Sequence, residues 1–263
     1  MSDKLNRVIA GLALTSTLTA CGSAGGAAAQ RAASTPVAKG EVIADQLPQG
    51  SEPVHLDPAD FTTRIDNPYW PMAPGSRWVY RETDGAGSVQ RVEVTVTDQT
   101  RKIANGVEAR VVHDVVTEDG KLVEDTFDWY AQDRQGNIWY LGEKTKEYES
   151  GKLVTTAGSW EAGVDGAQPG IIMPADPAAG MSYRQEYYKG EAEDSGKILS
   201  TDEQAQVPFD HFRDVLLTKD YTAIEPKVLE YKLYAKGVGP VLVFGVSGGG
   251  GQEQLVRFDS GGH

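Results

Sequence analysis

Hydrophobic and polar residues alternate with a period of two over most of the chain from Trp78 onward. Between Arg91 and Thr97, for example, valines alternate with charged residues and threonines, and the pattern returns from Met181 to Tyr188. No long stretch shows the 3.6-residue period of an amphipathic helix. The alternation is interrupted by Asp-Gly or Asn-Gly pairs at 84–85, 105–106 and 119–120. These signals predict antiparallel strands joined by short turns.

The order of these elements predicts the fold class. Strands follow strands without an intervening helix, which indicates an all-β domain, an antiparallel meander curved into a barrel or half-barrel. One short N-terminal helical turn is expected first, because Asp57 is a favourable cap and Pro58 suits the first helical position. Roughly 200 residues are available for the strands, which suits one β-domain. We therefore expect a single β-rich domain over residues 51–260.

An aromatic hairpin, Thr126–Glu143, lies at the centre of this pattern. With a three-residue loop of Arg134, Gln135 and Gly136, one face carries Phe127, Trp129, Ala131, Trp139 and Leu141. The other face carries Tyr130, Ile138 and Tyr140. Aromatic residues on both faces indicate a sheet that is either covered on both sides or curved around a lined cavity.

The preceding hairpin, across Asp119-Gly120, has two plausible registers. A two-residue loop places Asp114 opposite Asp125, and like charges opposite each other destabilise a sheet. A three-residue loop ending in a Gly120 bulge instead pairs Val111 with Phe127 and His113 with Asp125. We prefer this second register because it keeps the apolar residues together. It predicts that His113 and Asp125 are neighbours on the inward-facing surface of the sheet.

The Gly- and Pro-rich stretch Trp160–Gly180 contains Ile171, Ile172 and Met173 at its centre. It reads as the longest irregular segment, and loops of this length are often binding loops. We expect it to cover an aromatic-lined concavity that holds a ligand. The candidate ligand-binding residues are His113, Asp125, Trp129, Tyr130, Trp139, Tyr140, Ile171 and Met173.

A proline-rich segment, Ile65–Gly75, precedes the first strands. Its three prolines exclude a regular ladder, so we expect an extended segment that packs on the core through Tyr69, Trp70 and Met72. The alternative is a docking segment for a protein partner.

Residues 1–21 have the layout of a secretory leader, with Lys4 and Arg7 before an apolar run, Val8–Ala20. The run is shorter than the about 20 residues that span a bilayer. Its end, Leu18-Thr19-Ala20-Cys21, resembles the lipobox of bacterial lipoproteins, which implies cleavage before Cys21 and lipidation, for example with palmitate, at this sole cysteine. An ordinary leader with an incidental cysteine is the alternative.

The next segment, residues 22–50, is rich in Ala, Gly, Ser and Thr, and it predicts a flexible tether. Leader and tether together predict an extracytoplasmic domain that is anchored to the cell membrane by an N-terminal lipid. Acyl chains contribute about 0.8 kcal/mol per buried CH₂, so stable anchoring needs more than one chain.

The formal charge of −13 argues against nucleic acid as a partner, because such binding rewards basic surfaces. We expect most carboxylates to be solvated and expect no cofactor. A weak Ca²⁺ site is the one exception considered, although no segment fits an EF-hand loop. Its candidate ligands are Glu118, Asp119, Glu124, Asp128, Glu191, Glu193 and Asp194.

Four segments resemble a group of exported bacterial proteins of uncharacterised function. They are Asn67–Gly75 (Asn-Pro-Tyr-Trp-Pro-Met-Ala-Pro-Gly), Asp133–Glu143, Gly158–Ala167 and Tyr234–Gly239. The resemblance runs through most of the domain and implies an exported β-rich fold. It brings no catalytic residues.

A catalytic function has little support in the sequence. Gly245-Val246-Ser247-Gly248-Gly249 matches the nucleophile elbow of α/β-hydrolases, but that motif requires a following helix, and here a strand pattern follows. We therefore expect a non-catalytic, surface-tethered lipoprotein that binds or carries an apolar or small-molecule ligand. The alternatives are an envelope protein-protein interaction module and, more remotely, a hydrolase.

Overall fold

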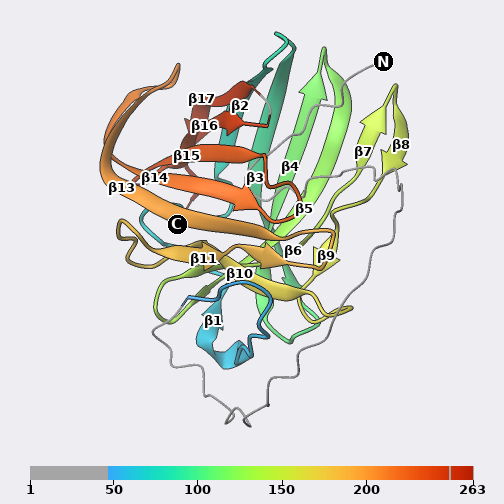
Figure 1. Ribbon diagram of the computed structural model, residues 1–263, viewed down its shortest axis with the longest axis vertical. Coiled ribbons are helices and arrows are strands. Elements are labelled where there is room, and N and C mark those ends of the chain that lie inside the picture. The colour runs from blue at the N-terminus through green and yellow to red at the C-terminus, as the bar shows by residue number, and fades with distance from the viewer. Residues whose placement is uncertain (1–46, 249, 263) are drawn as a thin grey trace, which may run out of the picture.

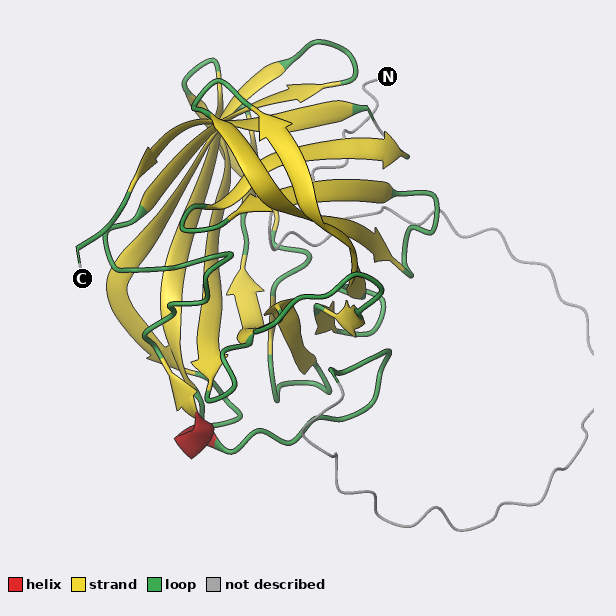
Figure 2. Cartoon of the chain, turned by 90° about the vertical axis from the view of Figure 1, so that its left-hand side faces the viewer, coloured by secondary structure: helices red, strands yellow, loops and turns green. Residues whose placement is uncertain are grey.

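The computed structural model describes residues 47–248 and 250–262. It confirms the all-β class, with antiparallel strands throughout and a single 3₁₀ turn at Pro58–Asp60. As expected, Asp57 caps this turn, and its carboxylate accepts a hydrogen bond from the Ala59 amide at 2.9 Å. Figure 2 shows the turn outside the sheet, at one end of the molecule. The predicted leader, most of the tether and Cys21 lie outside the described residues.

The domain begins earlier than predicted, because the last residues of the expected tether are packed. Pro48 is buried, and its carbonyl accepts a hydrogen bond from the Arg184 amide at 2.7 Å. The Arg184 guanidinium donates to the carbonyls of Gly50, Glu52 and Pro169 at 2.7–3.2 Å. Arg184 therefore fastens Pro48, Gly50 and Glu52 to the barrel, so the last residues of the expected tether belong to the folded domain.

The main wall of the sheet is a run of long antiparallel strands (Figure 1). In sheet order it contains β13 (Asp194–Gln206), β14 (His211–Thr222), β15 (Leu229–Ala235), β16 (Gly239–Ser247), β17 (Gly251–Asp259), β2 (Arg77–Asp84), β3 (Val89–Lys102), β4 (Glu108–Glu118), β5 (Lys121–Asp133) and β6 (Ile138–Lys144). Apart from the β17–β2 pair, neighbouring strands in this wall are consecutive in the chain, as the predicted meander requires. The β17–β2 pair joins the last strand of the chain to the first long strand.

Shorter strands bring the wall round into a nearly closed barrel. They are β1 (Phe61–Thr62), β7 (Glu147–Glu149), β8 (Lys152–Thr155), β9 (Trp160–Glu161), β10 (Gln168–Met173), β11 (Ser182–Arg184) and β12 (Glu186–Tyr187). β10 pairs with β6 on one side and β12 on the other, while β11 pairs with β13.

The prediction that Trp160–Gly180 is the longest irregular stretch is therefore wrong. Ile171, Ile172 and Met173 form the closing strand β10, since an apolar run bounded by Gly and Pro is also the pattern of a fully buried strand.

The β4–β5 register differs from both predicted registers. Asp119 and Gly120, both with positive φ, form a two-residue turn, and a bulge at Val116/Thr117 then shifts the pairing. Beyond the bulge His113 lies opposite Phe127 and Val115 opposite Asp125. The bulge avoids the Asp114–Asp125 pair that a plain two-residue loop would impose.

The two faces of this hairpin are also reversed relative to the prediction. Val112, Asp114, Asp128 and Tyr130 line the barrel interior together with residues of β2, β3 and β17. His113 and Asp125, predicted to point inward, have side chains that are 32% and 21% exposed on the outer face.

The proline-rich segment packs into one end of the barrel. Tyr69, Trp70 and Met72 are buried, as predicted, and Ile65 bridges to Met72. The Trp70 ring lies 5.8 Å from Tyr130 and 5.9 Å from Tyr234, between opposite walls. The aromatic residues of this segment are thus committed to the core. In the described part of the chain, no helix is long and apolar enough to cross a membrane.

Candidate functional site

The interior of the barrel is lined by tyrosines and carboxyl groups as well as by aliphatic side chains. Tyr80, Tyr130, Tyr140, Tyr183 and Tyr234 are each at most 3% exposed. The buried or nearly buried carboxyl groups belong to Asp114, Glu124, Asp128, Glu143, Glu186, Asp194, Asp220, Glu230 and Glu253. Buried carboxylates are costly without partners. Most other carboxylates of the described residues are at least partly exposed, as expected, and these buried groups are exceptions.

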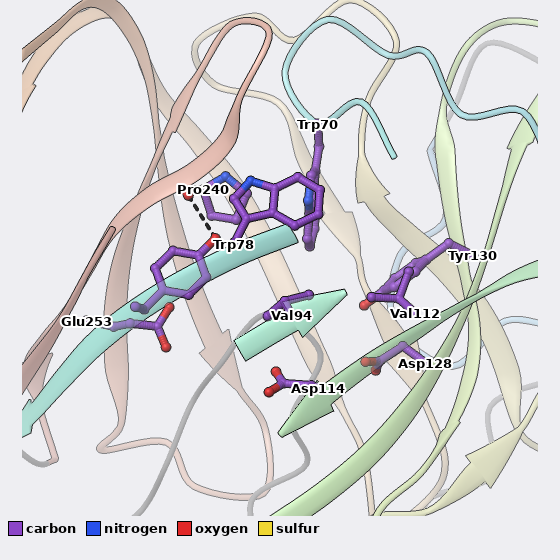
Figure 3. A pocket seen from close by; sticks show the side chains of 10 residues that line it. Trp70, Trp78, Val94, Val112, Asp114, Asp128, Tyr130, Pro240 and Glu253 are labelled. Atoms are coloured by element: carbon purple, nitrogen blue, oxygen red, sulfur yellow. Dashed lines mark hydrogen bonds between the residues drawn. The ribbon is translucent and has the colours of Figure 1, made fainter. Parts of the chain in front are cut away.

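A small void lies between Trp70 and the wall formed by β17, β2, β3, β4 and β5 (Figure 3). Aromatic side chains of Trp70, Trp78, Tyr80 and Tyr130 line it, and Asp114, Asp128 and Glu253 supply three carboxyl groups. Its volume of about 10 Å³ is close to the room that one water-sized particle needs. Pockets for drug-sized ligands are about 300–1,000 Å³. This void is therefore far too small for a large apolar ligand.

Two of the three carboxyl groups have an oxygen without a hydrogen-bond partner. Asp114 Oδ1 and Glu253 Oε2 are both buried and unpaired within residues 47–248 and 250–262. Burial raises the pKa of Asp114 well above its usual value, and the nearby carboxyls of Glu124 and Asp128 raise it further. Burial likewise raises the pKa of Glu253, with Glu82 and Glu230 adding to the shift. The void is thus a concentrated site of unsatisfied hydrogen-bond acceptors.

The third carboxyl group, Asp128, belongs to a hydrogen-bonded network. The Tyr140 hydroxyl lies 2.7 Å from Asp128 Oδ1 and 3.1 Å from Glu143 Oε2. The Tyr140 hydroxyl has one proton, so it donates to only one of these two carboxyl groups. In the other contact the carboxyl group must itself be protonated and donate to the hydroxyl oxygen. Burial raises the pKa of Asp128 to about 8, against the opposing effect of the Tyr140 hydrogen bond. Asp128 is thus held in its neutral form at neutral pH.

These shifts predict a pH dependence of stability. A carboxyl with a raised pKa in the folded state stabilises the fold fully below its unfolded pKa, and this contribution is lost as pH rises through the folded value. For Asp128 the window runs from 3.8 to about 8. For Glu230 it runs from 4.5 to about 8, because burial raises its pKa. We expect the free energy of unfolding, measured by urea titration, to fall between pH 4 and pH 8.

The Asp128→Asn variant should show a shallower fall, because its amide does not titrate. Exposed Asp176 provides a matched control, and Asp176→Asn should leave the slope unchanged. A stability that rises across this range in the wild-type domain would contradict the assignment.

Elsewhere in the interior, Asp220 is fully satisfied. The Lys232 ammonium lies 2.9 Å from Asp220 Oδ2, which also accepts from Gln185 Nε2 at 2.9 Å. The Thr218 hydroxyl donates to Asp220 Oδ1 at 2.7 Å. Burial alone would lower the pKa of Lys232, but Asp220 and Glu230 raise it on balance. Lys232 is therefore committed to a structural ion pair and leaves the Asp114–Glu253 void without a cation.

The structure separates the predicted ligand-binding residues into two groups. Tyr130 and Tyr140 face the interior and stack with ring centroids 4.9 Å apart. His113 and Asp125 do meet, with Nε2 to Oδ1 at 2.7 Å, but as diagonal neighbours on the outer face, where His113 stacks on Phe127. The predicted contact is confirmed, but it does not face the interior.

The other predicted residues are buried in packing contacts. The Arg101 guanidinium lies 4.1 Å from the Trp129 ring centroid, and the Trp139 indole donates to Asp133 Oδ2 at 2.7 Å. Ile171 and Met173 are fully buried in the β10–β6 pair.

Sequence reasoning missed Trp70, Trp78, Asp114 and Glu253 as residues that share one void. The usable signal was the period of two, since Asp114 and Asp128 have the same parity as Val112 and Tyr130.

The candidate calcium ligands do not converge. Glu124 and Asp128 are buried in the barrel interior, Asp194 is partly buried at the start of β13, and Glu118 and Asp119 lie at the β4–β5 turn. Within residues 47–248 and 250–262, no group of three or more His, Cys, Asp or Glu side chains is arranged to hold a metal ion.

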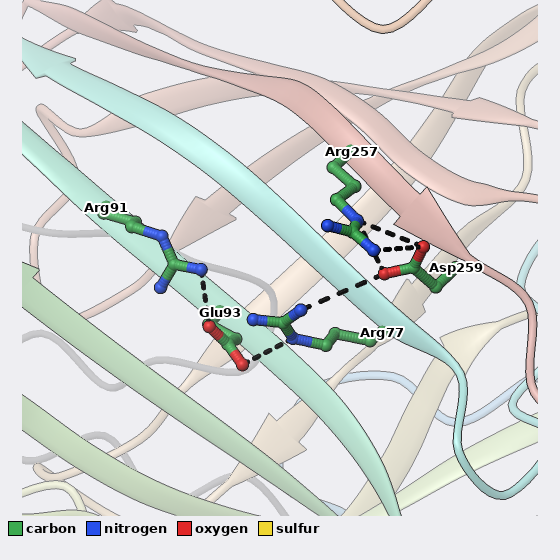
Figure 4. Close-up of polar contacts among 5 residues, drawn as sticks. All are labelled: Arg77, Arg91, Glu93, Arg257 and Asp259. Carbon is green, nitrogen blue, oxygen red and sulfur yellow. Dashed lines mark hydrogen bonds and ion pairs between the residues drawn. The ribbon is translucent and has the colours of Figure 1, made fainter.

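The outer face of β2, β3 and β17 carries a row of ion pairs (Figure 4). Glu93 lies 2.5 Å from Arg77 Nε and 2.6 Å from Arg91 Nη2, and Arg77 and Arg257 both approach Asp259. The Arg77 hydrogen bond lowers the pKa of Glu93 to about 2. Each of these arginines already has a carboxylate partner, so the row fits a structural role on the surface of the sheet.

Two further predicted features have a clear place in the fold. Ser247, in the pattern that resembles a nucleophile elbow, ends strand β16, and its hydroxyl donates to the Lys227 carbonyl at 2.8 Å. Strand β17 follows, as the alternation predicted.

The aromatic residues of Asn67–Gly75 are buried, so they are not available to dock a protein partner as the interaction hypothesis requires. A more exposed apolar surface is the β7–β8 hairpin, where Leu153 and Val154 are 52% and 47% exposed.

No protein-family model matches the chain, and no curated protein matches it. Among solved structures, one match is the crystal structure of a "putative lipoprotein" from Parabacteroides distasonis ATCC 8503. It is 12% identical, with 73% of this chain and 98% of that chain covered, at a TM-score of 0.38. A likeness at this level supports no conclusion about ligand, partner or activity.

Proposed function

We propose that this protein is a non-catalytic binding lipoprotein that holds a small polar solute in its barrel interior. One observation carries the proposal: the void beside Trp70 has two buried carboxyl groups with unpaired oxygens, at Asp114 and Glu253. An unsatisfied buried acceptor costs about 1–3 kcal/mol. A solute that donates hydrogen bonds to these oxygens would remove that cost and be retained.

The size of the void changes the ligand expected from the sequence. A bulky apolar ligand would have to displace Trp70 and expose the carboxyl groups to hydrocarbon. A small solute with hydrogen-bond donors fits both the volume and the lining. The leader and Cys21 support the remainder of the proposal, in which the domain is tethered outside the cell by lipid. Cys21→Ala should move the protein from the membrane fraction to the soluble fraction.

Binding is tested by a thermal-shift screen of small polar solutes on the purified domain, followed by calorimetry on each stabilising solute. We expect Asp114→Asn and Glu253→Gln to lower affinity at least tenfold, which corresponds to about 1.4 kcal/mol. Glu230→Gln is the matched control, because Glu230 is a buried carboxyl that does not line this void. If no solute stabilises the domain, or if all three variants respond as the wild type does, the proposal fails.

A further inference from the structure

We propose that the void between Trp70, Asp114 and Glu253 is a binding site for an ammonium group. The inference deepens the proposed function, on which it rests, by naming the chemical class of the solute. It depends on four properties of the void, namely its charge, its hydrogen-bonding pattern, its aromatic lining and its size.

Among the described residues, three carboxyl groups and no Lys or Arg side chain line the void, so a bound cation would favour the ionised form of these carboxyl groups. Asp114 on β4, Asp128 on β5 and Glu253 on β17 converge on it from three strands. The buried ammonium group of Lys232 is paired with Asp220 at 2.9 Å, and Lys232 does not line the void. A solute with a positive charge is therefore favoured over a neutral or anionic one.

The hydrogen-bonding pattern calls for a donor. Asp114 Oδ1 and Glu253 Oε2 have no partner in the described part of the chain, and Figure 3 shows both carboxyl groups beside the void. Two donors of the lining are already used, since the Tyr80 hydroxyl donates to the Pro240 carbonyl at 3.0 Å and the Trp78 indole donates to the Val238 carbonyl at 2.8 Å. Ammonium carries a proton on each of its four tetrahedral positions, so it can donate to both carboxylates at once.

The rest of the lining combines aromatic rings with the apolar side chains of Val94, Val112 and Pro240. The rings of Trp70, Trp78 and Tyr130 border the void, and aromatic faces attract ammonium groups within about 6 Å. Within the described residues, no group of three or more His, Cys, Asp or Glu side chains is arranged to hold a metal ion, so a bare metal cation is disfavoured here. Carboxylates on one side and aromatic faces on the other match a cation that donates hydrogen bonds in some directions and contacts π-faces in others.

The volume restricts the group further. A void of about 10 Å³ accepts a particle of the size of water, which fits free ammonium or the terminal group of a thin primary amine. A quaternary ammonium, with a methyl group in every direction, does not fit. Free ammonium and a primary amine share the same recognition chemistry, and the experiment separates them.

The test compares thermal unfolding of the domain at pH 8 in the chlorides of ammonium, methylammonium, tetramethylammonium, potassium and sodium, at equal concentration. We expect ammonium to raise Tm by about 2–4 °C over sodium. Methylammonium should match ammonium if the amine tail has room, and should match sodium if only the free ion enters. Tetramethylammonium and potassium should match sodium in either case.

Nitrogen-15 NMR provides a direct readout. Unlabelled protein with ¹⁵N-ammonium chloride should show a bound ammonium resonance whose protons exchange slowly with water. Asp114→Asn and Glu253→Gln should abolish this resonance and the Tm increment, while Glu230→Gln keeps both. Circular dichroism of each variant checks that the fold is retained.

Two results overturn the inference. One is an equal response to potassium and ammonium, which would mean that charge and size alone are recognised. The other is the absence of a bound resonance together with equal Tm in all five salts. If another small solute still stabilises the domain in a way that Asp114→Asn removes, the proposed binding function stands without ammonium; if none does, both are wrong.

Discussion

Replacing Gly170 with alanine is expected to abolish folding or to destabilise the domain by more than about 4 kcal/mol. A Cβ at Gly170 would lie 2.3 Å from the Gln185 carbonyl oxygen and 2.4 Å from that of Arg184. Both contacts are with backbone that joins β11 to β12, so no side-chain rotation relieves them. Because β10 and these two strands close the barrel, the displacement would open the sheet at its closure.

The measurement is the Tm from circular dichroism, with an expected fall of at least about 8 °C at 2–4 °C per kcal/mol. Gly262→Ala is the control, because its Cβ meets nothing within 4 Å and it should melt with the wild type. A Gly170→Ala protein that melts within a degree or two of the wild type would contradict the close approach of β10 to the backbone of Arg184 and Gln185.

Replacing Lys232 with methionine is expected to cost about 3–5 kcal/mol, because it leaves the Asp220 carboxylate buried without its cation. Both side chains are at most 5% exposed, so water cannot take over the role of the ammonium. The remaining partners of Asp220, Gln185 and Thr218, donate hydrogen bonds but carry no charge. Urea unfolding monitored by tryptophan fluorescence measures the loss.

The double variant Lys232→Met with Asp220→Asn distinguishes a stranded charge from lost packing. Since both charges are removed together, the double variant should recover most of the stability lost in the single variant. If the double variant is as unstable as the sum of the two single variants, the ion pair contributes no coupling and the cost comes from packing.

The architecture could be predicted from the sequence because the strands show a hydrophobic period of two and the turns contain Asp-Gly or Asn-Gly pairs. Asp119 and Gly120 both adopt the positive φ that their hairpin requires, and Asp57 caps its turn as expected. Strand β10 (Gln168–Met173) reads as a loop in the sequence because the glycines and prolines in and around it signal irregular backbone. In the structure, Gly170 allows the β10 backbone to pass close to the backbone of Arg184 and Gln185. This requirement comes from tertiary packing, which the local sequence pattern does not show.

The orientation of the faces was not predictable from the β4–β5 hairpin alone. The face with His113, Val115 and Phe127 is the more apolar in sequence, yet the face with Asp114 and Asp128 lines the interior. A single bulge at Val116/Thr117 sets the register, and a bulge leaves no mark in the hydrophobic pattern. The interior carboxyl groups were missed because acidic residues at alternate positions normally indicate a solvated face.

The void itself depends on residues that no local pattern connects. Trp70 comes from the proline-rich segment, Asp114 from β4 and Glu253 from β17, so only the closed barrel brings them together. The sequence showed that the Trp70 segment packs on the core, but it could not show which wall the indole approaches.

The pairing of β17 with β2 has a consequence for the order in which the protein can mature. Asp259 lies opposite Arg77, and the Trp70 indole packs against Gly239. A chain that crosses a membrane with its N-terminus first exposes β2 and Trp70 long before their partners emerge. Contacts so distant in sequence form slowly. The barrel can close only when β17 reaches β2, which in the proposed export means after the whole chain has crossed, so the early strands must be kept from pairing with other proteins until then.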